Sequence, residues 1–429
     1  MNEIPSSKVE RAGKFMKTGL KVGGNYIKHY AKKLVNSDTP QSELDRANAA
    51  DIYEALSELK GSALKAAQML SMDQSLLPKE YTQKFAEAQY NAPALSGPLV
   101  VKTFERHFGK SPFALYDSFE LQAVHAASIG QVHKATKYGK DLAVKIQYPG
   151  VGDSVISDLN LVKPVAKRLF GWKDKDIDMY FQEVQERLVE ETDYLLEQKR
   201  GIDISQKCAH IANLTFPTYF PELCSQRIIT MEWVKGMHLE AFLATNPSQE
   251  ICNTIGQALW DFYNFQIHHL QQMHADAHPG NYLFQENGQV CILDFGCVKV
   301  FPQKFITTYR QVLEAGVVEN DALFRKLCIE MEAIRENEPD KALEAKFLEL
   351  IRGGIKLLCL PFHTETFDFA DEAYFTSLYA YGKQASENKE LRSSAPRGTP
   401  HAIYMNRTYF GLFSILHELK ANICTRNFL

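Results

Sequence analysis

Apolar residues recur every three or four positions along most of this chain, which is the spacing of one face of an amphipathic helix. Between about residue 115 and residue 147 the pattern shortens towards alternation, which indicates β-strands. Helical spacing returns at about residue 153 and dominates beyond Gly236. The expected helices before that point are 8–35, 42–73, 78–90, 98–108, 153–171 and 176–205, and the expected strands are 115–124, 131–138, 141–147, 216–220 and 227–234.

These elements predict an α+β protein in three parts. A helical extension covers residues 1–112, a small antiparallel sheet with inserted helices covers 113–235, and a mostly helical region covers 236–429. The one interruption expected in the last part is a strand-loop-strand region over 274–299. The polar stretch 386–399 is the best candidate for a mobile surface loop.

The composition is that of a protein with a substantial hydrophobic core. Its 429 residues are 45% hydrophobic and 11% aromatic, which excludes disordered and small disulfide-stapled classes. The formal charge of −4 argues against a protein that coats nucleic acid.

Eight scattered cysteines suit free thiols in a reducing compartment, with neither disulfides nor structural zinc. Without a signal peptide or a long apolar run, we expect a cytoplasmic chain that does not span a membrane.

The charge is nevertheless unevenly distributed. Residues 1–35 carry eight basic groups against two acidic ones, a net charge of +6, so the remainder carries about −10. The predicted helix 8–35 places apolar residues on one side and lysines largely on the other, and we expect it to loosen at Gly23-Gly24. Two interpretations are open. The helix attaches the protein peripherally to an anionic membrane surface, or it packs on its own protein with a solvated lysine face.

The strongest chemical signal lies in the strand-loop-strand region. Asn281 follows Asp276 by five residues, and Asp294, in an Asp-Phe-Gly triplet, follows Asn281 by thirteen. This is the spacing of a kinase catalytic loop and its metal-binding turn. Asp276 can orient or deprotonate an attacking hydroxyl or water. Asn281 and Asp294 offer hard oxygen ligands for a Mg²⁺ ion that bridges the phosphates of ATP.

A phosphate-binding segment is expected upstream of this loop. The sequence Leu-Ala-Val-Lys ending at Lys145 matches the kinase strand that presents a phosphate-binding lysine. It follows an alanine-rich loop in which one of the three kinase glycines remains. Because each Cβ hinders the close approach of backbone amides to phosphate, this loop should hold ATP differently from a glycine-rich one. The nucleotide-binding residues expected in the loop are Ala126, Ala127, Ser128, Gly130 and Val132.

Three motifs together resemble the ABC1 (UbiB, Coq8, ADCK) family of atypical kinases. They are the alanine-rich loop, a K-x-x-Q segment at 65–68 and a Glu-Thr-Asp segment at 191–193. The resemblance covers nearly the whole chain from about residue 40. It implies a bilobal protein-kinase-like fold with a small antiparallel sheet in the N-lobe, a mostly helical C-lobe and an N-terminal helical extension. His125 replaces the first alanine of the family's loop, and Ala67 replaces a glycine of its K-x-G-Q motif.

The resemblance also implies roles for single residues. It pairs Glu197 with Lys145, and it makes the helix that bears Lys65 a gate folded over the active site. Lys65 would meet the acids Glu191 and Asp193. The same helix would point Gln68 at the nucleotide.

Helical spacing supports an acidic cluster independently of the resemblance. Glu190, Asp193 and Glu197 are three and four residues apart, so we expect them to crowd one end of a single helix. Like charges at this spacing are destabilising unless nearby cations neutralise them, and Lys65 and Lys145 are the natural candidates for these cations.

The segment 228–236 is expected to leave the sheet as a strand and enter a hinge. The backbone at Glu232 and Val234 should hydrogen-bond adenine, and Met231 should border the pocket. After Asp-Phe-Gly, the sequence runs almost directly into a helix that begins near Gln303, with no Ala-Pro-Glu. The platform on which protein kinases bind a peptide is therefore missing.

The leading hypothesis is an atypical Mg-ATP-dependent kinase or ATPase that acts on a lipid or small molecule. As the resemblance implies, it would work at a membrane surface in isoprenoid-quinone metabolism. The alternatives are a small-molecule phosphotransferase of the aminoglycoside or choline kinase type, and a nucleotide-gated scaffold.

Overall fold

The computed structural model describes residues 8–35, 40–59, 65, 80–81, 84, 95–126, 129–170, 174–317, 320–387 and 399–425. It confirms a mixed α+β structure and divides into two compact units. Unit 1 comprises Met1–Gln198 and Tyr219–Trp233, and unit 2 comprises Lys199–Thr218 and Val234–Leu429. The division into three parts stays a prediction.

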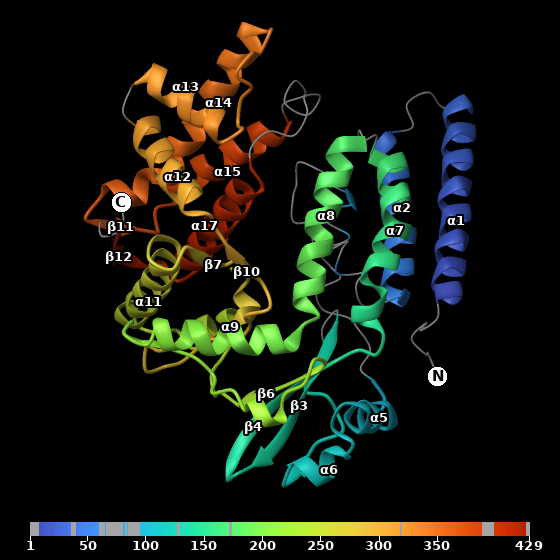
Figure 1. The fold of residues 1–429 in the computed structure, drawn as a ribbon. Helices are drawn as coiled ribbons and strands as arrows, with labels where there is room; N and C mark the ends of the chain where they lie inside the picture. Colours follow the sequence, from blue (N-terminus) through green and yellow to red (C-terminus); the bar gives the residue numbers. More distant parts are fainter. Residues whose placement is uncertain are drawn as a thin grey trace. The chain divides into compact units, whose positions relative to one another are not determined.

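Four long helices of unit 1 pack against one another (Figure 1). They are α1 (Lys8–Val35), α2 (Gln41–Leu59), α7 (Val151–Phe170) and α8 (Asp174–Glu191), and α1 contacts both α2 and α7. The expected loosening at Gly23-Gly24 is wrong, because α1 continues through both glycines. The later part of the expected helix 42–73 and most of 78–90 lie outside the described residues.

Helix α1 packs on α2 through polar contacts. Asn25 donates hydrogen bonds to Asn48 (3.1 Å) and Asp51 (2.7 Å). Ion pairs join Lys21 to Glu54 at 2.8 Å and Lys32 to Glu43 at 2.6 Å. Packing on its own protein is therefore part of what this helix does.

The sheet of unit 1 is small and antiparallel. Its main path runs β1 (Ser118–Phe119), β3 (Gly130–Lys137), β4 (Lys140–Gln147) and β6 (Ile228–Glu232), and β2 (His125–Ala126) pairs with β3. Tyr138 and Gly139 join β3 to β4 with φ values of 56° and 69°, the positive values that a tight hairpin turn requires. Helix α5 (Gly97–Phe108) contributes Val100 and Phe104 to the core under the sheet, and α6 (Pro112–Leu115) follows it.

Three expected elements differ from the structure. The strand over 115–124 shrinks to Ser118–Phe119. The strand over 216–220 is wrong, since the segment makes only an isolated bridge from Tyr219 to Met231; Pro217 lacks the N–H that a ladder needs. The helix over 176–205 is two helices, α8 and α9 (Tyr194–Lys207).

Unit 2 is mostly helical, as expected. Its helices are α10 (Leu239–Ala244), α11 (Gln249–His268), α12 (Gln303–Val317), α13 (Asp321–Glu330), α14 (Lys341–Cys359), α15 (Glu372–Glu387) and α17 (Pro400–Glu418). Trp260 of α11 is fully buried among aromatic rings, with Phe362 at 4.9 Å and Phe413 at 6.3 Å between centroids. Most of the expected mobile loop 386–399 lies outside the described residues.

Short strands interrupt these helices. The region 274–299 contains β8 (Tyr282–Phe284), β9 (Val290–Ile292) and β10 (Val298–Val300), preceded by β7 (Gln272–His274). Strand β7 pairs with β10, and β9 lies between β8 and the parallel strand β5 (Leu214–Thr215). A further pair, β11 (Thr366–Asp368) with β12 (Asn422–Cys424), is not among the strands expected from the sequence.

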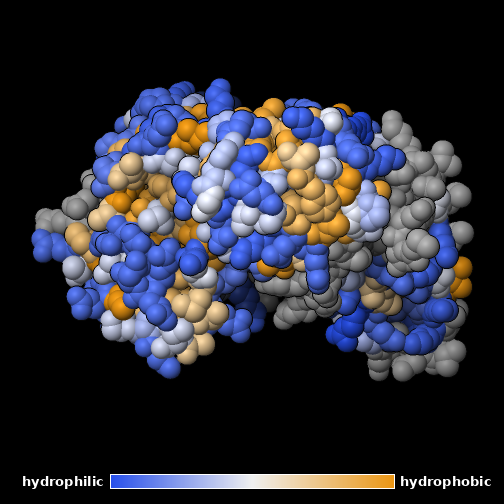
Figure 2. Space-filling model, turned by 90° about the horizontal axis from the view of Figure 1, so that it is seen from below, coloured by the Kyte–Doolittle hydropathy of each residue, from blue (hydrophilic) through white to orange (hydrophobic). Residues whose placement is uncertain are grey.

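The surface is largely polar on the face drawn in Figure 2, where hydrophilic residues cover most of the area and hydrophobic ones are interspersed. Such a mixture is ordinary for a folded protein. Among the described helices, none has the length and apolar character needed to cross a membrane. The eight cysteines are free thiols.

Candidate functional site

The predicted lysine and glutamate of unit 1 form a buried ion pair. Lys145 on β4 places its Nζ 3.0 and 3.1 Å from the two carboxylate oxygens of Glu197, in the first turn of α9. Glu197 is 1% exposed and the Lys145 side chain 16% exposed. The lysine also lies over the ring of Tyr194, 5.0 Å from its centroid. A charge held in this way points in a defined direction, which is what orienting a phosphate requires.

Several predicted nucleotide-binding residues share one face of the sheet. Val132 on β3 stands directly opposite Lys145, and Met231 on β6 stands opposite Ala143, two residues before Lys145. Directly opposed residues and residues two apart project to the same side of a sheet. His125 stands opposite Val132 and joins this face.

The other predicted residues of the alanine-rich loop do not all lie on this face of the sheet. Ala126 stands opposite Gln131, on the other face of the sheet from Val132. A Cβ on Gly130 would lie 2.6 Å from the Ile146 carbonyl oxygen and 2.8 Å from the Tyr194 hydroxyl, so packing alone requires glycine there. Ala127 and Ser128 lie outside the described residues.

Two polar residues just after Gly130 have a role that sequence reasoning missed. Gln131 is 1% exposed and His133 is fully buried. The Gln131 Oε1 accepts the N–H of Leu95 at 2.5 Å, its Nε2 contacts the His133 Nε2 at 2.7 Å, and the His133 Nδ1 lies 2.8 Å from the carbonyl oxygen of Glu120. The motif that carries the nucleotide loop therefore also ties the sheet to Leu95, just before α5.

Lys65 and Glu191 are brought together, as the resemblance implies. The Lys65 Nζ lies 3.2 Å from a carboxylate oxygen of Glu191, the last residue of α8, and both side chains are partly exposed. Gln68 lies outside the described residues, so its predicted place beside the nucleotide stays a prediction.

The expectation that the acids crowd one end of a single helix is wrong. Helix α8 ends at Glu191 and α9 begins at Tyr194, so Glu190 and Glu197 lie on different helices. Asp193 lies between them, and its Oδ1 accepts the N–H groups of Leu195 (3.2 Å) and Leu196 (3.1 Å). This is an N-cap, which satisfies donors that the first turn of a helix leaves open.

In unit 2 the predicted catalytic loop is organised by hydrogen bonds. Asp276 follows β7, and Asn281 closes the short 3₁₀ turn Pro279–Asn281 before β8. The Asn281 Nδ2 donates to the main-chain oxygen of Asp276 at 3.0 Å and to its carboxylate at 2.9 Å. Since the amide nitrogen holds Asp276, the amide oxygen is the atom of Asn281 that a cation would bind.

Asp294 follows β9 and is fixed on two sides. Its Oδ1 accepts the N–H of Gly296 at 2.8 Å, and its main-chain oxygen lies 2.5 Å from the Nε2 of His274. The N–H of Leu293 donates to the main-chain oxygen of Asn281 at 3.0 Å, which connects the turn with Asn281. Asp276, Asn281 and Asp294 are thus held in one hydrogen-bonded framework.

The donor set of this framework fits Mg²⁺. Asn281 and Asp294 supply hard oxygen atoms, and Mg²⁺ is usually bound by one or two protein ligands together with substrate phosphates and water. Within the described part of the chain, no three His, Cys, Asp or Glu side chains form a group that could hold a metal without such help.

The predicted hinge contains the boundary between the units, which falls after Trp233. The N–H of Trp233 donates to the Asp141 carbonyl oxygen at 2.9 Å. Hydrogen-bonded pairs alternate along an antiparallel ladder, so the next pair, Glu232 with Leu142, is not hydrogen-bonded. The main-chain groups of Glu232 therefore point away from β4, to the side on which Tyr219 bridges to Met231, and the contact to adenine stays a prediction. Val234 begins the next segment of unit 2.

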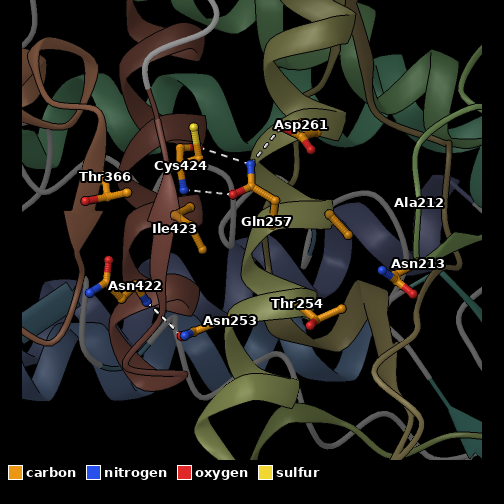
Figure 3. A pocket seen from close by; sticks show the side chains of 11 residues that line it. Ala212, Asn213, Asn253, Thr254, Gln257, Asp261, Thr366, Asn422, Ile423 and Cys424 are labelled. Atoms are coloured by element: carbon orange, nitrogen blue, oxygen red, sulfur yellow. Dashed lines mark hydrogen bonds between the residues drawn. The ribbon is translucent and has the colours of Figure 1, made fainter.

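A cavity of about 360 Å³ in unit 2 contains none of the predicted site residues (Figure 3). It lies between α11, β12 and the segment before β5, and its amides are largely engaged. Asn253 accepts the N–H of Asn422 at 2.9 Å, and Gln257 exchanges two hydrogen bonds with the main chain of Cys424. These side chains close the open edge of β12 in the place of a neighbouring strand. Burial raises the pKa of Asp261, which also lines the cavity.

Comparison with known proteins supports one family. The family model of the ABC1 atypical kinase-like domain matches residues 87–327, more than half of the chain. The chain is 28% identical to the mitochondrial atypical kinase COQ8B of Danio rerio, over 99% of this chain and 68% of that protein. It is also 28% identical to the probable serine/threonine-protein kinase abkA of Dictyostelium discoideum, over 74% of this chain and 60% of that protein.

A solved structure supports the same assignment. Rv3197 of Mycobacterium tuberculosis, in complex with erythromycin, matches with a TM-score of 0.60 and 25% identity, over 90% of this chain and 95% of that one. The expected kinase-like α+β fold is thereby confirmed. The chain belongs to the ABC1 atypical kinase-like family.

Proposed function

We propose that this protein is an atypical kinase or ATPase that uses Mg-ATP. The observation that carries the proposal is the buried pair between Lys145 and Glu197, because a strand lysine oriented by a helix glutamate is the device with which kinases hold nucleotide phosphates. Asp276 would act on the attacking hydroxyl or water. Asn281 and Asp294 would hold Mg²⁺, which neutralises the charge of the phosphates during transfer.

The test is nucleotide binding by an Asp294→Asn variant. Removing the carboxylate charge should lower the affinity for ATP in Mg²⁺ at least about 100-fold, since the metal loses its charged protein ligand. Asp261→Asn is the matched control, because this aspartate lies in the same unit but in the cavity away from the predicted site. Calorimetric titration with a non-hydrolysable ATP analogue measures both. Unchanged binding by Asp294→Asn would refute the site.

We further propose a small-molecule or lipid substrate of isoprenoid-quinone metabolism rather than a protein. Two residues separate the end of β10 at Val300 from the start of α12 at Gln303, which leaves no length for the peptide platform of a protein kinase. Turnover should therefore respond to phenolic isoprenoid precursors and not to peptides. ADP formation, measured against a panel of both, checks the substrate class, because ADP is the product of phosphoryl transfer and of hydrolysis alike.

Attachment to an anionic membrane surface is part of the same proposal. On α1, Ile27 is 73% and Tyr30 58% exposed, and Lys28, the residue after Ile27 in the sequence, is exposed as well. Ile27→Glu should weaken sedimentation with anionic vesicles, and Leu323→Glu, the same kind of change at an exposed residue of α13, should not. Equal binding by wild type and Ile27→Glu would exclude this surface.

Turnover also separates the enzyme from its alternatives. A nucleotide-gated scaffold would bind Mg-ATP tightly without consuming it, whether or not anionic vesicles are present. A phosphotransferase of the aminoglycoside or choline kinase type is disfavoured by the ABC1 match over residues 87–327. ATP consumption with and without vesicles is therefore the decisive measurement.

A further inference from the structure

A chain of buried polar groups lies behind the catalytic loop of unit 2. Tyr263 comes from α11, His274 from β7 and Tyr282 from the first position of β8; the two tyrosines are fully buried and His274 is 1% exposed. The hydroxyl groups of the tyrosines contact each other, and that of Tyr263 lies 3.4 Å from the His274 Nδ1. The His274 Nε2 in turn lies 2.5 Å from the main-chain oxygen of Asp294.

The chemistry of the last link fixes the direction of the whole chain. A carbonyl oxygen can only accept, so the His274 Nε2 carries the hydrogen. In the neutral form of the ring, a hydrogen on Nε2 leaves Nδ1 as an acceptor, and this is the atom that the Tyr263 hydroxyl contacts. Tyr263 must then donate to the Nδ1, and its own oxygen is left to accept from Tyr282. Hydrogen bonds therefore run from Tyr282 through Tyr263 and His274 to Asp294.

Both tyrosines are suited to act as donors. Burial raises the pKa of each hydroxyl well above its ordinary value, and the negative charge of Asp276 raises both further. Each therefore keeps its proton at neutral pH.

We propose that Tyr263 and Tyr282 are positioning residues of the active site. By holding His274 with its hydrogen on Nε2, they fix the main chain of Asp294, and with it the carboxylate that binds Mg²⁺. The inference rests on the proposed Mg-nucleotide function, and it adds two residues that belong to none of the predicted motifs. The ring of Phe295, packed edge-on against His274 at 5.6 Å, holds the imidazole from another side.

Removing single hydroxyl groups tests the proposal without emptying the core. Tyr263→Phe should raise the Mg²⁺ concentration that half-saturates binding of an ATP analogue about tenfold, as loss of an outer partner of a metal ligand commonly does. Tyr282→Phe should have a smaller effect, because Tyr263 still donates to His274. Tyr409→Phe is the control, since Tyr409 is equally buried in unit 2 and donates to Asn264 at 3.0 Å.

The pattern among the three variants decides the outcome. A shift for Tyr263→Phe, a smaller one for Tyr282→Phe and none for Tyr409→Phe supports the relay. Equal shifts for all three would mean a general loss of packing and would overturn it, and so would no shift for Tyr263→Phe. Calorimetry over a range of Mg²⁺ concentrations measures the shift as binding, independently of turnover.

The tautomer of His274 provides a second readout that needs neither metal nor nucleotide. Long-range ¹H–¹⁵N spectra of protein with labelled histidine should show His274 with hydrogen on Nε2 and a bare Nδ1. Tyr263→Phe should shift the Nδ1 resonance, and Tyr409→Phe should leave it unchanged. A hydrogen on Nδ1 in the wild type would overturn the relay. If the wild type instead fails to bind Mg-ATP at all, the proposed function fails, and these spectra still decide the relay.

Discussion

The two units hold their predicted functional residues by different means. In unit 1, ion pairs join residues far apart in sequence, Lys145 to Glu197 and Lys65 to Glu191. In unit 2, residues 274–296 form one local framework in which side chains bond to main-chain atoms. A charge pair depends on both partners and on their burial, whereas a local hydrogen-bonded loop keeps its shape when one charge is neutralised. The first arrangement therefore couples function to stability more strongly than the second.

The largest effect on stability is expected at the buried pair. Lys145→Met takes the ammonium group away from the Glu197 carboxylate, which is 1% exposed, and should cost about 3 to 5 kcal/mol of unfolding free energy. Glu197→Gln should cost less, because Lys145 is 16% exposed and retains the ring of Tyr194. The double variant should lose less than the sum of the two. Urea denaturation of all four proteins gives the coupling energy.

The contrast with unit 2 supplies the control. Asp294→Asn keeps an oxygen that can accept from Gly296, so it should change stability by less than about 1 kcal/mol while Mg-ATP binding is lost. If Asp294→Asn and Lys145→Met destabilise the protein equally, the proposed difference between the units is wrong.

The second largest effect is expected from acid in unit 2. Burial, followed by the charge of Arg310, lowers the pKa of His268 to about 4. The folded protein therefore excludes a proton that the unfolded chain takes up near pH 6.5. Stability is fully present above pH 6.5 and is lost as the pH falls towards 4, by up to about 3 kcal/mol. Denaturation at pH 7, 5.5 and 4.5 measures the slope.

His268→Gln should remove most of this slope between pH 6.5 and 4. His363→Gln, which changes an exposed histidine elsewhere in unit 2, is the matched control and should leave it. An unchanged slope in His268→Gln would mean that other groups cause the acid sensitivity of unit 2.

The difference between the units also explains what sequence could predict. The spacing of Asp276, Asn281 and Asp294 was enough to predict that the three residues belong to one local framework. Short strands and turns leave few ways to arrange residues that are close in sequence. The pair of Lys145 with Glu197, 52 residues away, followed only from the family resemblance. A local pattern in the sequence does not indicate which helix will pack against a given strand.

The misses have physical reasons at particular residues. The helical spacing continues through Asp193, where an acid suits either the face of one long helix or the N-cap of a second helix. The signal for a new helix was an aspartate, a good capping residue, directly before the apolar Tyr194 and Leu195. Tyr263 has the spacing of a core residue on its helix, and only tertiary structure gives its hydroxyl a partner. The position of Tyr282 directly after Asn281 is the one local hint.

A smaller effect is expected where the two helices α8 and α9 meet. Asp193→Ala removes the N-cap and should cost about 1 kcal/mol. Asp193→Ser restores a capping oxygen without the charge, so stability should return. Urea denaturation checks the cap, and ATP turnover of the serine variant tests the predicted catalytic role. Full turnover would make Asp193 a cap alone, and lost turnover in a stable serine variant would make its charge functional.

The smallest effect on stability is expected at the partly exposed pair. The side chains of Lys65 and Glu191 are 24% and 13% exposed, so solvent and salt screen their attraction, and Lys65→Ala should cost less than about 1 kcal/mol. Stability measured at 50 and 500 mM salt should converge between wild type and this variant, whereas the cost of Lys145→Met should hardly change. If the helix bearing Lys65 is a gate, the variant should change the rate of ATP turnover while its affinity for Mg-ATP stays the same. A loss of affinity would instead place Lys65 among the residues that bind the nucleotide. Breaking a weak, partly exposed ion pair releases too little free energy to change the structure of a binding site elsewhere.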